Sequence, residues 1–234
     1  MSKDKALAYL DANRPLHIDM IDPILRDSVE ILYADADGVL FKELVSNTFM
    51  ISSDSEVRGR ELLDALGKQD LYCVHQKYLY DWLMQKYPDL ESFACYQTVY
   101  EKSQPIQRNV AQLDIRPLGV EDIDIVFRNY SAFADYGYIK NRLESGALFG
   151  GYTDGRICGF IGTHEEGSIG LLEVFDEYKK RGFGYELLSF MINRFLANGQ
   201  TPYGQIAVDN EASKALNRKL GFTLSEDILY WVFR

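Results

Sequence analysis

The stretch LLEVFDEYKKRGFG at residues 171–184 is the most informative part of the chain. The apolar residues 169–175 predict a buried strand, and the apolar spacing of residues 185–192 predicts a helix. Between them lie three cations and two glycines, and glycines allow a tight turn that presents successive backbone N–H groups. The N-terminus of the following helix favours anions. The stretch therefore predicts a phosphate-binding turn, although an ordinary strand-to-helix turn with solvated lysines would carry the same residues.

A second pattern lies downstream, as NEAS at residues 210–213 and LNRKLGF at residues 216–222. Together the two patterns resemble the GNAT superfamily of N-acetyltransferases. That family binds pyrophosphate with Arg/Gln-x-x-Gly-x-Gly/Ala, which residues 179–184 match with lysine in the first position. Its later motif is Asn-x-x-Ala/Ser followed by Leu-Tyr-x-Lys-x-Gly-Phe. The downstream residues match this motif, except that Asn217 replaces the tyrosine.

Composition narrows the class of protein. The 234 residues suffice for one large or two small domains, and a hydrophobic share of 47% indicates a fully globular chain. No apolar run approaches the ~20 residues of a membrane span, and residues 1–6 lack the apolar stretch of a signal peptide. The three cysteines are far apart and show no metal-binding spacing, so we expect reduced core thiols. A cytoplasmic protein with no membrane and no metal partner is expected.

The net charge of −10 bears on the choice of partner. Such acidity disfavours nucleic acid, because neutralising phosphates requires a basic face on the protein. It mildly favours a cationic substrate such as an amine, through electrostatic steering. Many soluble proteins are acidic without any such role, so the charge alone decides little.

The chain is predicted to form two domains, at residues 1–110 and 113–234. The segment Glu101–Leu113 is polar, contains a proline and lacks clear periodicity, which is typical of a linker. The GNAT resemblance covers residues 113–234, where the patterns predict the element order that this fold requires. The expected strands there are 113–118, 147–152, 157–164, 168–174, 203–208 and 228–233, and the expected helices are 120–133, 138–145, 185–192 and one ending at 219–222.

The first domain is predicted to repeat this plan in a degenerate form. Its expected strands are 29–33, 39–45, 48–52, 71–75 and 92–100, and its expected helices are 53–66 and 78–87. The glycine turn is not repeated, because EVRGR at residues 56–60 has a single glycine. We infer an α/β (α+β) GNAT fold with a mixed central sheet flanked by helices. It resembles the tandem glycine N-acyltransferase-like and FR47-like members, with a non-binding first copy; an unrelated α/β domain is the alternative.

The resemblance implies that the cofactor is acetyl-CoA or another acyl-CoA. Its pyrophosphate would lie over the N–H groups of residues 180–185, with the neighbouring cations adding charge-assisted contacts. The thioester carbonyl would bond a main-chain N–H near Val174. Asn210 would line the cofactor channel or simply cap the following helix. The expected cofactor-binding residues are Val174, Phe175, Lys179, Lys180, Arg181, Gly182, Phe183, Gly184, Tyr185, Asn210, Ser213 and Asn217.

Acyl transfer to an amine requires removal of a proton, because an alkylammonium with a pKa of about 10 is mostly protonated at neutral pH. Glu173 is the expected base, since it interrupts an apolar strand beside the expected thioester site. Burying a carboxylate there is costly unless it is paired, so a structural ion pair is the alternative. Glu166 acting through a water that Ser168 orients is the competing assignment, with a solvated turn acid as its own alternative.

The resemblance therefore implies an acyl-CoA-dependent N-acyltransferase that moves an acetyl group to a primary amine of a small molecule by direct attack on the thioester. Asn217 cannot protonate the leaving thiolate as the family's tyrosine does. Two alternatives therefore stay open: a non-catalytic CoA-binding sensor or interaction module, and a tandem-GNAT transferase of another acyl group. The first half would act as a lid or as a homodimer surface. The residues expected near the acceptor, or else in ordinary packing, are Tyr136, Tyr138, Arg142, Tyr230 and Trp231.

Overall fold

A computed structural model describes residues 2–108, 113–130 and 135–234. Its contacts divide the chain into two compact units that do not coincide with the two halves of the sequence. Unit 1 comprises residues 1–99, 203–215 and 222–234, and unit 2 comprises residues 100–202 and 216–221. Along the chain, the order of two helices, three strands, helix, strand, helix and strand occurs twice.

Unit 1 contains a mixed sheet in the order β1-β2-β3-β4-β11-β5-β10. Neighbouring strands are antiparallel except β3 and β4, which run parallel. β5 of the first half lies between β10 and β11 of the second half, so the halves share one sheet here. This pairing is why the compact units do not follow the order of the sequence. The strands are β1 (Val29–Asp35), β2 (Gly38–Glu43), β3 (Phe49–Ser53), β4 (Leu71–Val74), β5 (Glu91–Val99), β10 (Tyr203–Ala207) and β11 (Thr223–Phe233).

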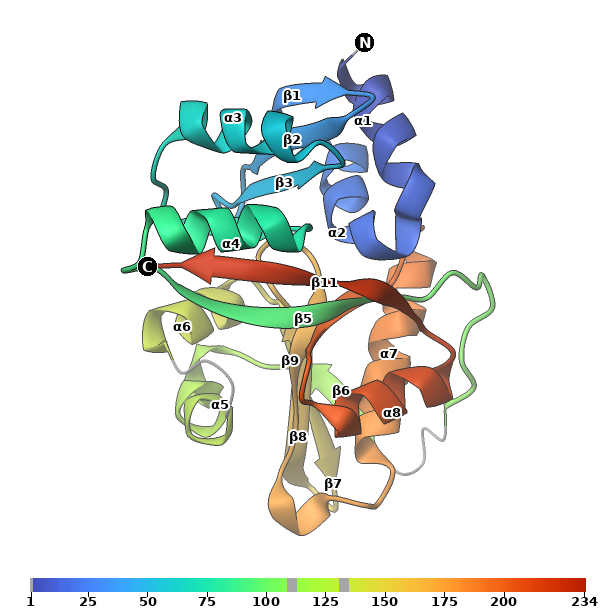
Figure 1. Cartoon of the computed structure of the whole chain (residues 1–234). Helices are drawn as coiled ribbons and strands as arrows, with labels where there is room; N and C mark the ends of the chain where they lie inside the picture. The colour runs from blue at the N-terminus through green and yellow to red at the C-terminus, as the bar shows by residue number, and fades with distance from the viewer. Residues whose placement is uncertain (1, 109–112, 131–134) are drawn as a thin grey trace. The chain divides into compact units, whose positions relative to one another are not determined.

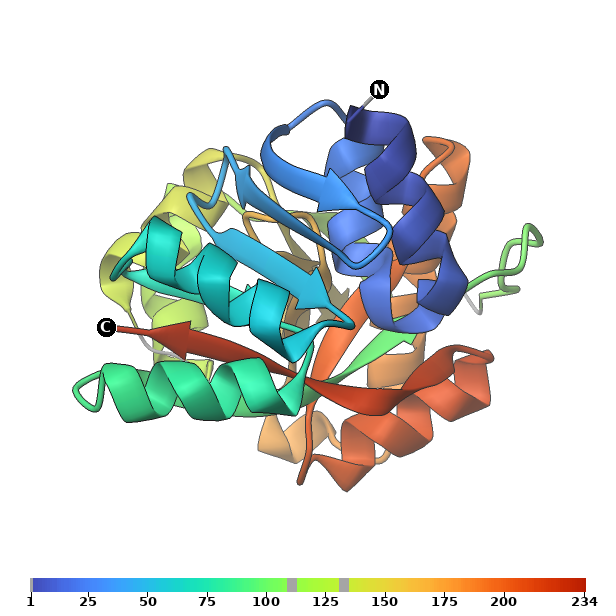
Figure 2. The same ribbon diagram turned by 45° about the horizontal axis from the view of Figure 1, so that its top comes forward.

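Helices cover both faces of the unit 1 sheet (Figures 1 and 2). Side chains alternate along each strand, so Phe41 packs in the core beneath α1 and α2, whereas Leu40 packs in the core beneath α3 and α4. Trp231 and Tyr230 of β11 separate in the same way. Two hydrophobic cores result, one on each face. The helices are α1 (Ser2–Leu10), α2 (Arg14–Leu25), α3 (Glu56–Leu66) and α4 (Lys77–Lys86), with a 3-10 turn at Asp11–Asn13 between the first two.

Unit 2 contains an antiparallel sheet in the order β9-β8-β7-β6. Helices α5 and α6 cover one face, burying Val126 and Ile139 against Leu148 and Phe160, and α7 covers the other face (Figure 1). The strands are β6 (Asp114–Pro117), β7 (Leu148–Thr153), β8 (Arg156–Thr163) and β9 (Ile169–Val174). The helices are α5 (Ile123–Asn129), α6 (Tyr136–Glu144) and α7 (Phe183–Ala197), with 3-10 turns at Val120–Asp122 and Asp176–Tyr178. Helix α8 (Glu211–Leu220) begins in unit 1 and ends in unit 2.

Most predicted elements are confirmed to within a few residues, and three differences have physical causes. The helix predicted at 120–133 starts as a 3-10 turn and ends at Asn129, and residues 131–134 lie outside the described ranges. Strand β11 begins earlier than predicted, at Thr223, because an irregularity in its pairing with β5 between Leu224 and Ile228 breaks the alternation. Helix α2 was not predicted because residues 16–24 are all buried, so no polar stripe marks it.

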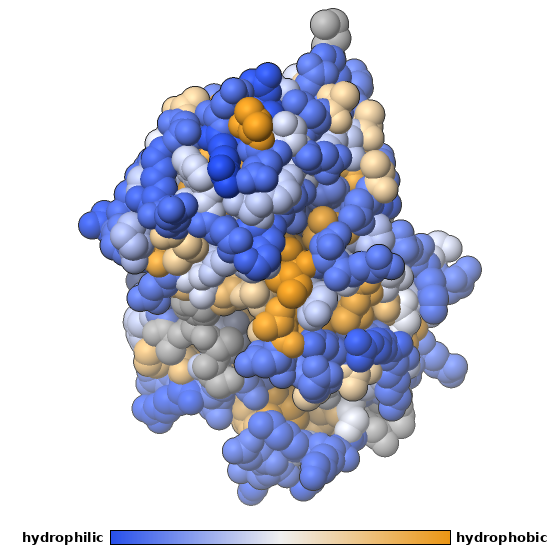
Figure 3. All heavy atoms as spheres, viewed as in Figure 1, coloured by the Kyte–Doolittle hydropathy of each residue, from blue (hydrophilic) through white to orange (hydrophobic). Residues whose placement is uncertain are grey.

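The surface and the cysteines agree with a globular chain. Hydrophilic side chains cover most of the face seen in Figure 3. None of the helices in the described ranges is both long and apolar enough to cross a membrane. Cys73, Cys95 and Cys158 are buried free thiols, which confirms the sequence prediction for these residues.

Candidate functional site

The turn at residues 179–184 lies in unit 2, between the Asp176–Tyr178 3-10 turn and helix α7. Lys180 and Gly182 have left-handed backbone conformations, with φ angles of 62° and 85°. Gly182 is the N-cap of the 15-residue helix and makes no side-chain cap bond. The first N–H groups of a helix have no partner inside it, and no cap side chain serves them here. Such a turn at a helix N-terminus forms an anion-binding concavity.

The three cations of this turn are not equivalent. The Lys179 ammonium forms an ion pair with Asp176 at 2.6 Å, so its charge is already balanced. The Arg181 guanidinium carbon lies 5.4 Å from the ring centroid of Tyr178. Within the described part of the chain, neither Lys180 nor Arg181 forms an ion pair with an acidic side chain. Lys180 and Arg181 therefore supply the charge available to an anion at this turn.

The two glycines of the turn serve different purposes. At Gly182 nothing lies within 4 Å of the position a Cβ would take, so the left-handed backbone, not crowding, calls for glycine. At Gly184, inside α7, a Cβ would lie 3.6 Å from Leu216 and 3.8 Å from Val174, which is ordinary contact. Neither packing nor backbone conformation explains glycine at position 184. Close approach of a ligand to the backbone would explain it.

Strand β9 is irregular just before the turn. Leu171 has a left-handed φ of 51°, and the pairing with β8 shifts by one residue before Glu173. This is a β-bulge, which bends a strand and re-aims the side chains that follow it. Val174 pairs with Gly159, and the next N–H, that of Phe175, bonds to β8 at 2.9 Å. The Val174 N–H therefore faces away from β8, as the expected thioester contact requires.

The expected catalytic residues belong to one polar cluster in unit 2. Glu166 is only 5% exposed and accepts a hydrogen bond from Ser168 Oγ at 2.5 Å. Glu173 is half-buried in β9. Burial, followed by the nearby charges of Glu173 and Glu166, raises the pKa of Tyr130 to about 12. The alternative of Glu166 as a solvated turn acid is wrong, because the turn folds this side chain inward. Tyr130 was missed, since one tyrosine at a helix end carries no motif.

The cluster extends to the residues around Glu166. The Tyr138 hydroxyl of α6 shares a hydrogen bond of 2.5 Å with His164 Nδ1. Burial, followed by the charge of Glu166, raises the pKa of Tyr138. The buried Arg142 guanidinium lies 3.6 Å from Glu165. Two of the residues expected near the acceptor, Tyr138 and Arg142, thus lie in this part of unit 2.

The remaining acceptor candidates have other surroundings. Tyr136 is exposed and packs edge-on against Phe127. Tyr230 and Trp231 belong to unit 1. The Tyr230 ring stacks on another tyrosine at 4.1 Å, and Trp231 Nε1 donates to Gln205 at 3.1 Å. These contacts are ordinary packing and hydrogen bonding for all three side chains. Tyr230 in addition lines a cavity in unit 1.

The downstream motif forms helix α8. Asn210 Oδ1 accepts a hydrogen bond from the Ser213 N–H at 3.0 Å. Asn210 therefore caps this helix, which is the second of the two roles expected from the sequence. Asn217 is 8% exposed. The Lys219 ammonium lies 5.3 Å from the ring centroid of Tyr185, so within unit 2 the end of α8 lies beside the start of α7.

Comparisons with known proteins bear on the fold of the chain. Residues 147–232 match the family of FR47-like proteins, and no functionally curated protein matches the chain. A Drosophila protein of solved structure has a TM-score of 0.66 at 16% identity, covering 83% of this chain and 72% of that one. A GCN5-related N-acetyltransferase-like protein from Streptococcus suis has a TM-score of 0.55 at 14% identity, covering 99% and 98% of the two chains.

A GNAT-family acetyltransferase from Colwellia psychrerythraea has a TM-score of 0.53 at 14% identity, covering 97% of each chain. At such identities the likeness establishes the fold. The chain is a protein of GNAT fold whose segment 147–232 is FR47-like.

Proposed function

We propose that this protein is an acyl-CoA-dependent N-acyltransferase that acetylates a primary amine of a small molecule. The observation that carries the proposal is the turn at residues 179–184. It combines two left-handed residues, an uncapped 15-residue helix and two cations that have no acidic partner among the described residues. A diphosphate offers the negative charge and the acceptor oxygens that such a turn accommodates. The acetyltransferases among the solved structures of this fold support the same assignment.

The residues present fit an acyl-CoA. Lys180, Arg181 and the first N–H groups of α7 would hold its diphosphate. The lack of a side chain at Gly184 leaves room for a ligand close to the backbone. The N–H of Val174 would bond the thioester carbonyl, because it faces away from β8. The bound group would supply an activated acyl carbon.

The amine must lose a proton before it can act as a nucleophile. We assign Glu173 as the base, because the bulge at Leu171 redirects this side chain next to Val174. Tyr130, whose raised pKa keeps its phenol protonated, lies near enough to sense the charge of Glu173. The Glu166–Ser168 pair is the competing proton acceptor, since Glu166 is buried and hydrogen-bonded.

A thiol-release assay tests this function. Acetyl-CoA is incubated with the full chain and a panel of primary amines, and free CoA thiol is followed. The proposal predicts that Glu173→Gln lowers turnover by about a hundredfold or more while acetyl-CoA binding is retained. Glu177→Gln, an exposed acid in the neighbouring 3-10 turn, is the matched control. Full activity of Glu173→Gln together with loss of activity in Glu166→Gln would transfer the role to Glu166.

A second candidate function is a CoA-binding module without catalysis. It is favoured by Asn217, which replaces the family's proton-donating tyrosine and is buried on α8. An amide cannot protonate a thiolate. If acetyl-CoA stabilises the chain but no amine releases thiol, this second function replaces the first. If acetyl-CoA neither binds nor stabilises the chain, both functions are wrong.

A further inference from the structure

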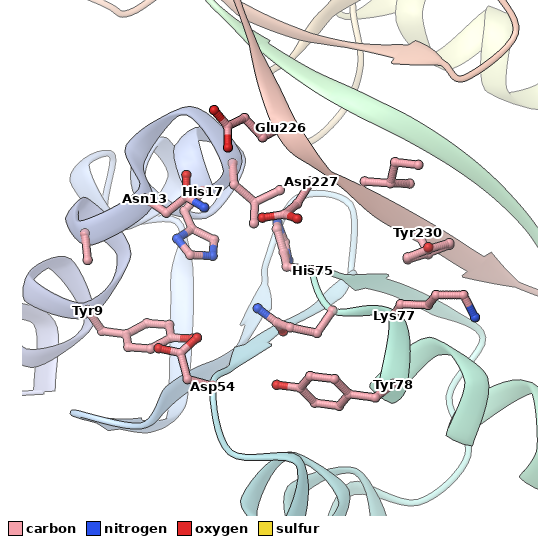
Figure 4. A pocket seen from close by; sticks show the side chains of 14 residues that line it. Tyr9, Asn13, His17, Asp54, His75, Lys77, Tyr78, Glu226, Asp227 and Tyr230 are labelled. Atoms are coloured by element: carbon pink, nitrogen blue, oxygen red, sulfur yellow. The ribbon is translucent and has the colours of Figure 1, made fainter.

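Unit 1 contains a cavity of about 640 Å³, and every residue that lines it belongs to this unit (Figure 4). The cavity lies at the carboxyl ends of β3 and β4, where the parallel pairing stops after Ile51 and Val74. The chain continues from these strands into α3 and α4. A volume of this size falls within the range of about 300–1000 Å³ that is typical of small-molecule sites. The first half lacks the glycine turn, yet it has a cavity of its own.

The floor of the cavity is built around His17. Its Nδ1 lies 3.1 Å from the carbonyl oxygen of Leu10, and its Nε2 lies 2.8 Å from Ser52 Oγ. A carbonyl only accepts, so Nδ1 carries the proton and Nε2 accepts from Ser52. Burial, followed by the charge of His75, lowers the pKa of His17 to about 4. Gln76 Nε2 also donates to Ser52 Oγ at 2.7 Å, so the neutral imidazole is held in one orientation.

His75, beside it, is held in the charged form. Its Nδ1 lies 3.0 Å from the carbonyl oxygen of Ile51, and its Nε2 lies 2.9 and 3.1 Å from the two carboxylate oxygens of Asp19. Both partners are acceptors, so both nitrogens donate. Burial opposes this charge, but Asp19 outweighs burial and the pKa of His75 is raised. Cys73 Sγ also contacts Asp19, at 3.5 Å. Asp19, Cys73 and His75 therefore lie together, although their spacing in the sequence did not predict this. The two imidazoles of the floor are therefore held by hydrogen bonds, and the charge of His75 is balanced by that of Asp19.

The rim of the cavity carries uncompensated negative charge. Asp54, Glu226 and Asp227 are exposed acids that line it (Figure 4). Within the described ranges, none of the three forms an ion pair. Lys77, which also lines the cavity, has its ammonium 2.7 Å from Asp81 and so adds no free charge. An anionic ligand would meet three carboxylates here, whereas a cation would be attracted.

We propose that this cavity is a second small-molecule site whose ligand is an organic cation carrying at least one primary ammonium group. The rim acids supply the attraction, and three tyrosine rings among the lining residues, Tyr9, Tyr78 and Tyr230, offer faces for cation–π contact. The fixed floor needs no reordering on binding, which lowers the cost of association. The site shares no residue with the turn at 179–184 or with the Glu166 cluster, so it stands whether or not the chain is an acyltransferase.

Binding of diaminobutane to the full chain, measured by calorimetry and by amide chemical shifts, tests this site. Butanediol, which has the same length and no charge, is the matched ligand control. The double variant Glu226→Gln/Asp227→Asn is expected to weaken diaminobutane binding by about tenfold or more, because it removes two of the three rim charges. Glu30→Gln/Asp70→Asn removes two exposed charges of unit 1 outside the cavity and is expected to leave binding unchanged. Shifted amides are expected at Gln76 and Tyr78.

A second variant tests the cavity by filling it, without changing any charge. Ala12 lines the cavity and is exposed, so Ala12→Trp fills the space without removing any polar group of the floor. It is expected to abolish diaminobutane binding while the unfolding midpoint is retained. The proposal is overturned if diaminobutane does not bind at millimolar concentration or if butanediol binds equally well. It is also overturned if Glu226→Gln/Asp227→Asn or Ala12→Trp binds diaminobutane like the unmodified chain.

Discussion

Acidification should destabilise the fold through His17, because this side chain is buried in its neutral form. The pKa of His17 is lowered from 6.5 to about 4 in the folded chain. Between these values the unfolded chain binds a proton that the folded chain does not, so stability falls as pH falls through this window. At about 1.4 kcal/mol per pH unit, the full difference is about 3.5 kcal/mol, of which about 2.5 kcal/mol is reached at pH 4.5.

The assay is urea unfolding, with the free energy of unfolding measured at intervals from pH 7 to pH 4.5. Carboxylates titrate in the same range, so the informative quantity is the difference between two chains. His17→Gln removes the titrating group, and its stability should fall by about 2.5 kcal/mol less than that of the unmodified chain over this range. The variant starts less stable, since it loses the bonds to Leu10 and Ser52, but only the slope is compared. Parallel slopes for the two chains would refute the reasoning.

Three further predictions concern other parts of the chain. Asp19→Ala leaves the His75 imidazole without its buried counter-charge, and the urea unfolding free energy should drop by about 3–5 kcal/mol; a loss below about 1 kcal/mol would show that the pair is not charged. Gly182→Ala should cost about 1 kcal/mol of stability because of its left-handed backbone, whereas Gly184→Ala, inside α7, should leave stability equal or higher and weaken acetyl-CoA binding; calorimetry that finds unchanged affinity would remove Gly184 from the site. Burial raises the pKa of Cys158 to about 11, so a thiol reagent at pH 8 should modify this residue only at the rate of unfolding, and rapid labelling would contradict its placement in β8.

Local patterns sufficed where a local property decides the structure. The turn at residues 179–184 could be predicted because the left-handed backbone before helix α7 calls for glycine, which the sequence shows directly. Short apolar runs located β2, β3 and β8 for the same reason. The sequence could predict that Glu173 lies in this strand next to Val174. It could not predict the bulge at Leu171 that re-aims Glu173, because the left-handed residue is not a glycine.

Long-range features could not be predicted from such patterns. The insertion of β5 between β10 and β11 depends on pairing between strands that lie far apart in the sequence, which periodicity does not encode. The burial of Glu166 depends on how a turn folds against α6 and α5. The cavity of unit 1 draws on four separate segments, and His17 lies in α2, a helix that its uniformly buried sequence concealed. Sites assembled from distant segments become visible only in three dimensions.

Calorimetric titration of the full chain with acetyl-CoA tests the central claim, that the turn at residues 179–184 binds the diphosphate of an acyl-CoA. The decisive comparison is between Lys180→Glu, which reverses a cation that has no acidic partner in the described part of the chain, and Lys140→Glu, which reverses an exposed lysine of α6. Lys180→Glu should weaken acetyl-CoA binding by about tenfold or more, Lys140→Glu should not change it, and acetyl-pantetheine, which lacks the diphosphate, should bind both variants and the unmodified chain equally weakly. Equal acetyl-CoA affinity in all three chains, or no binding at all, would contradict the account.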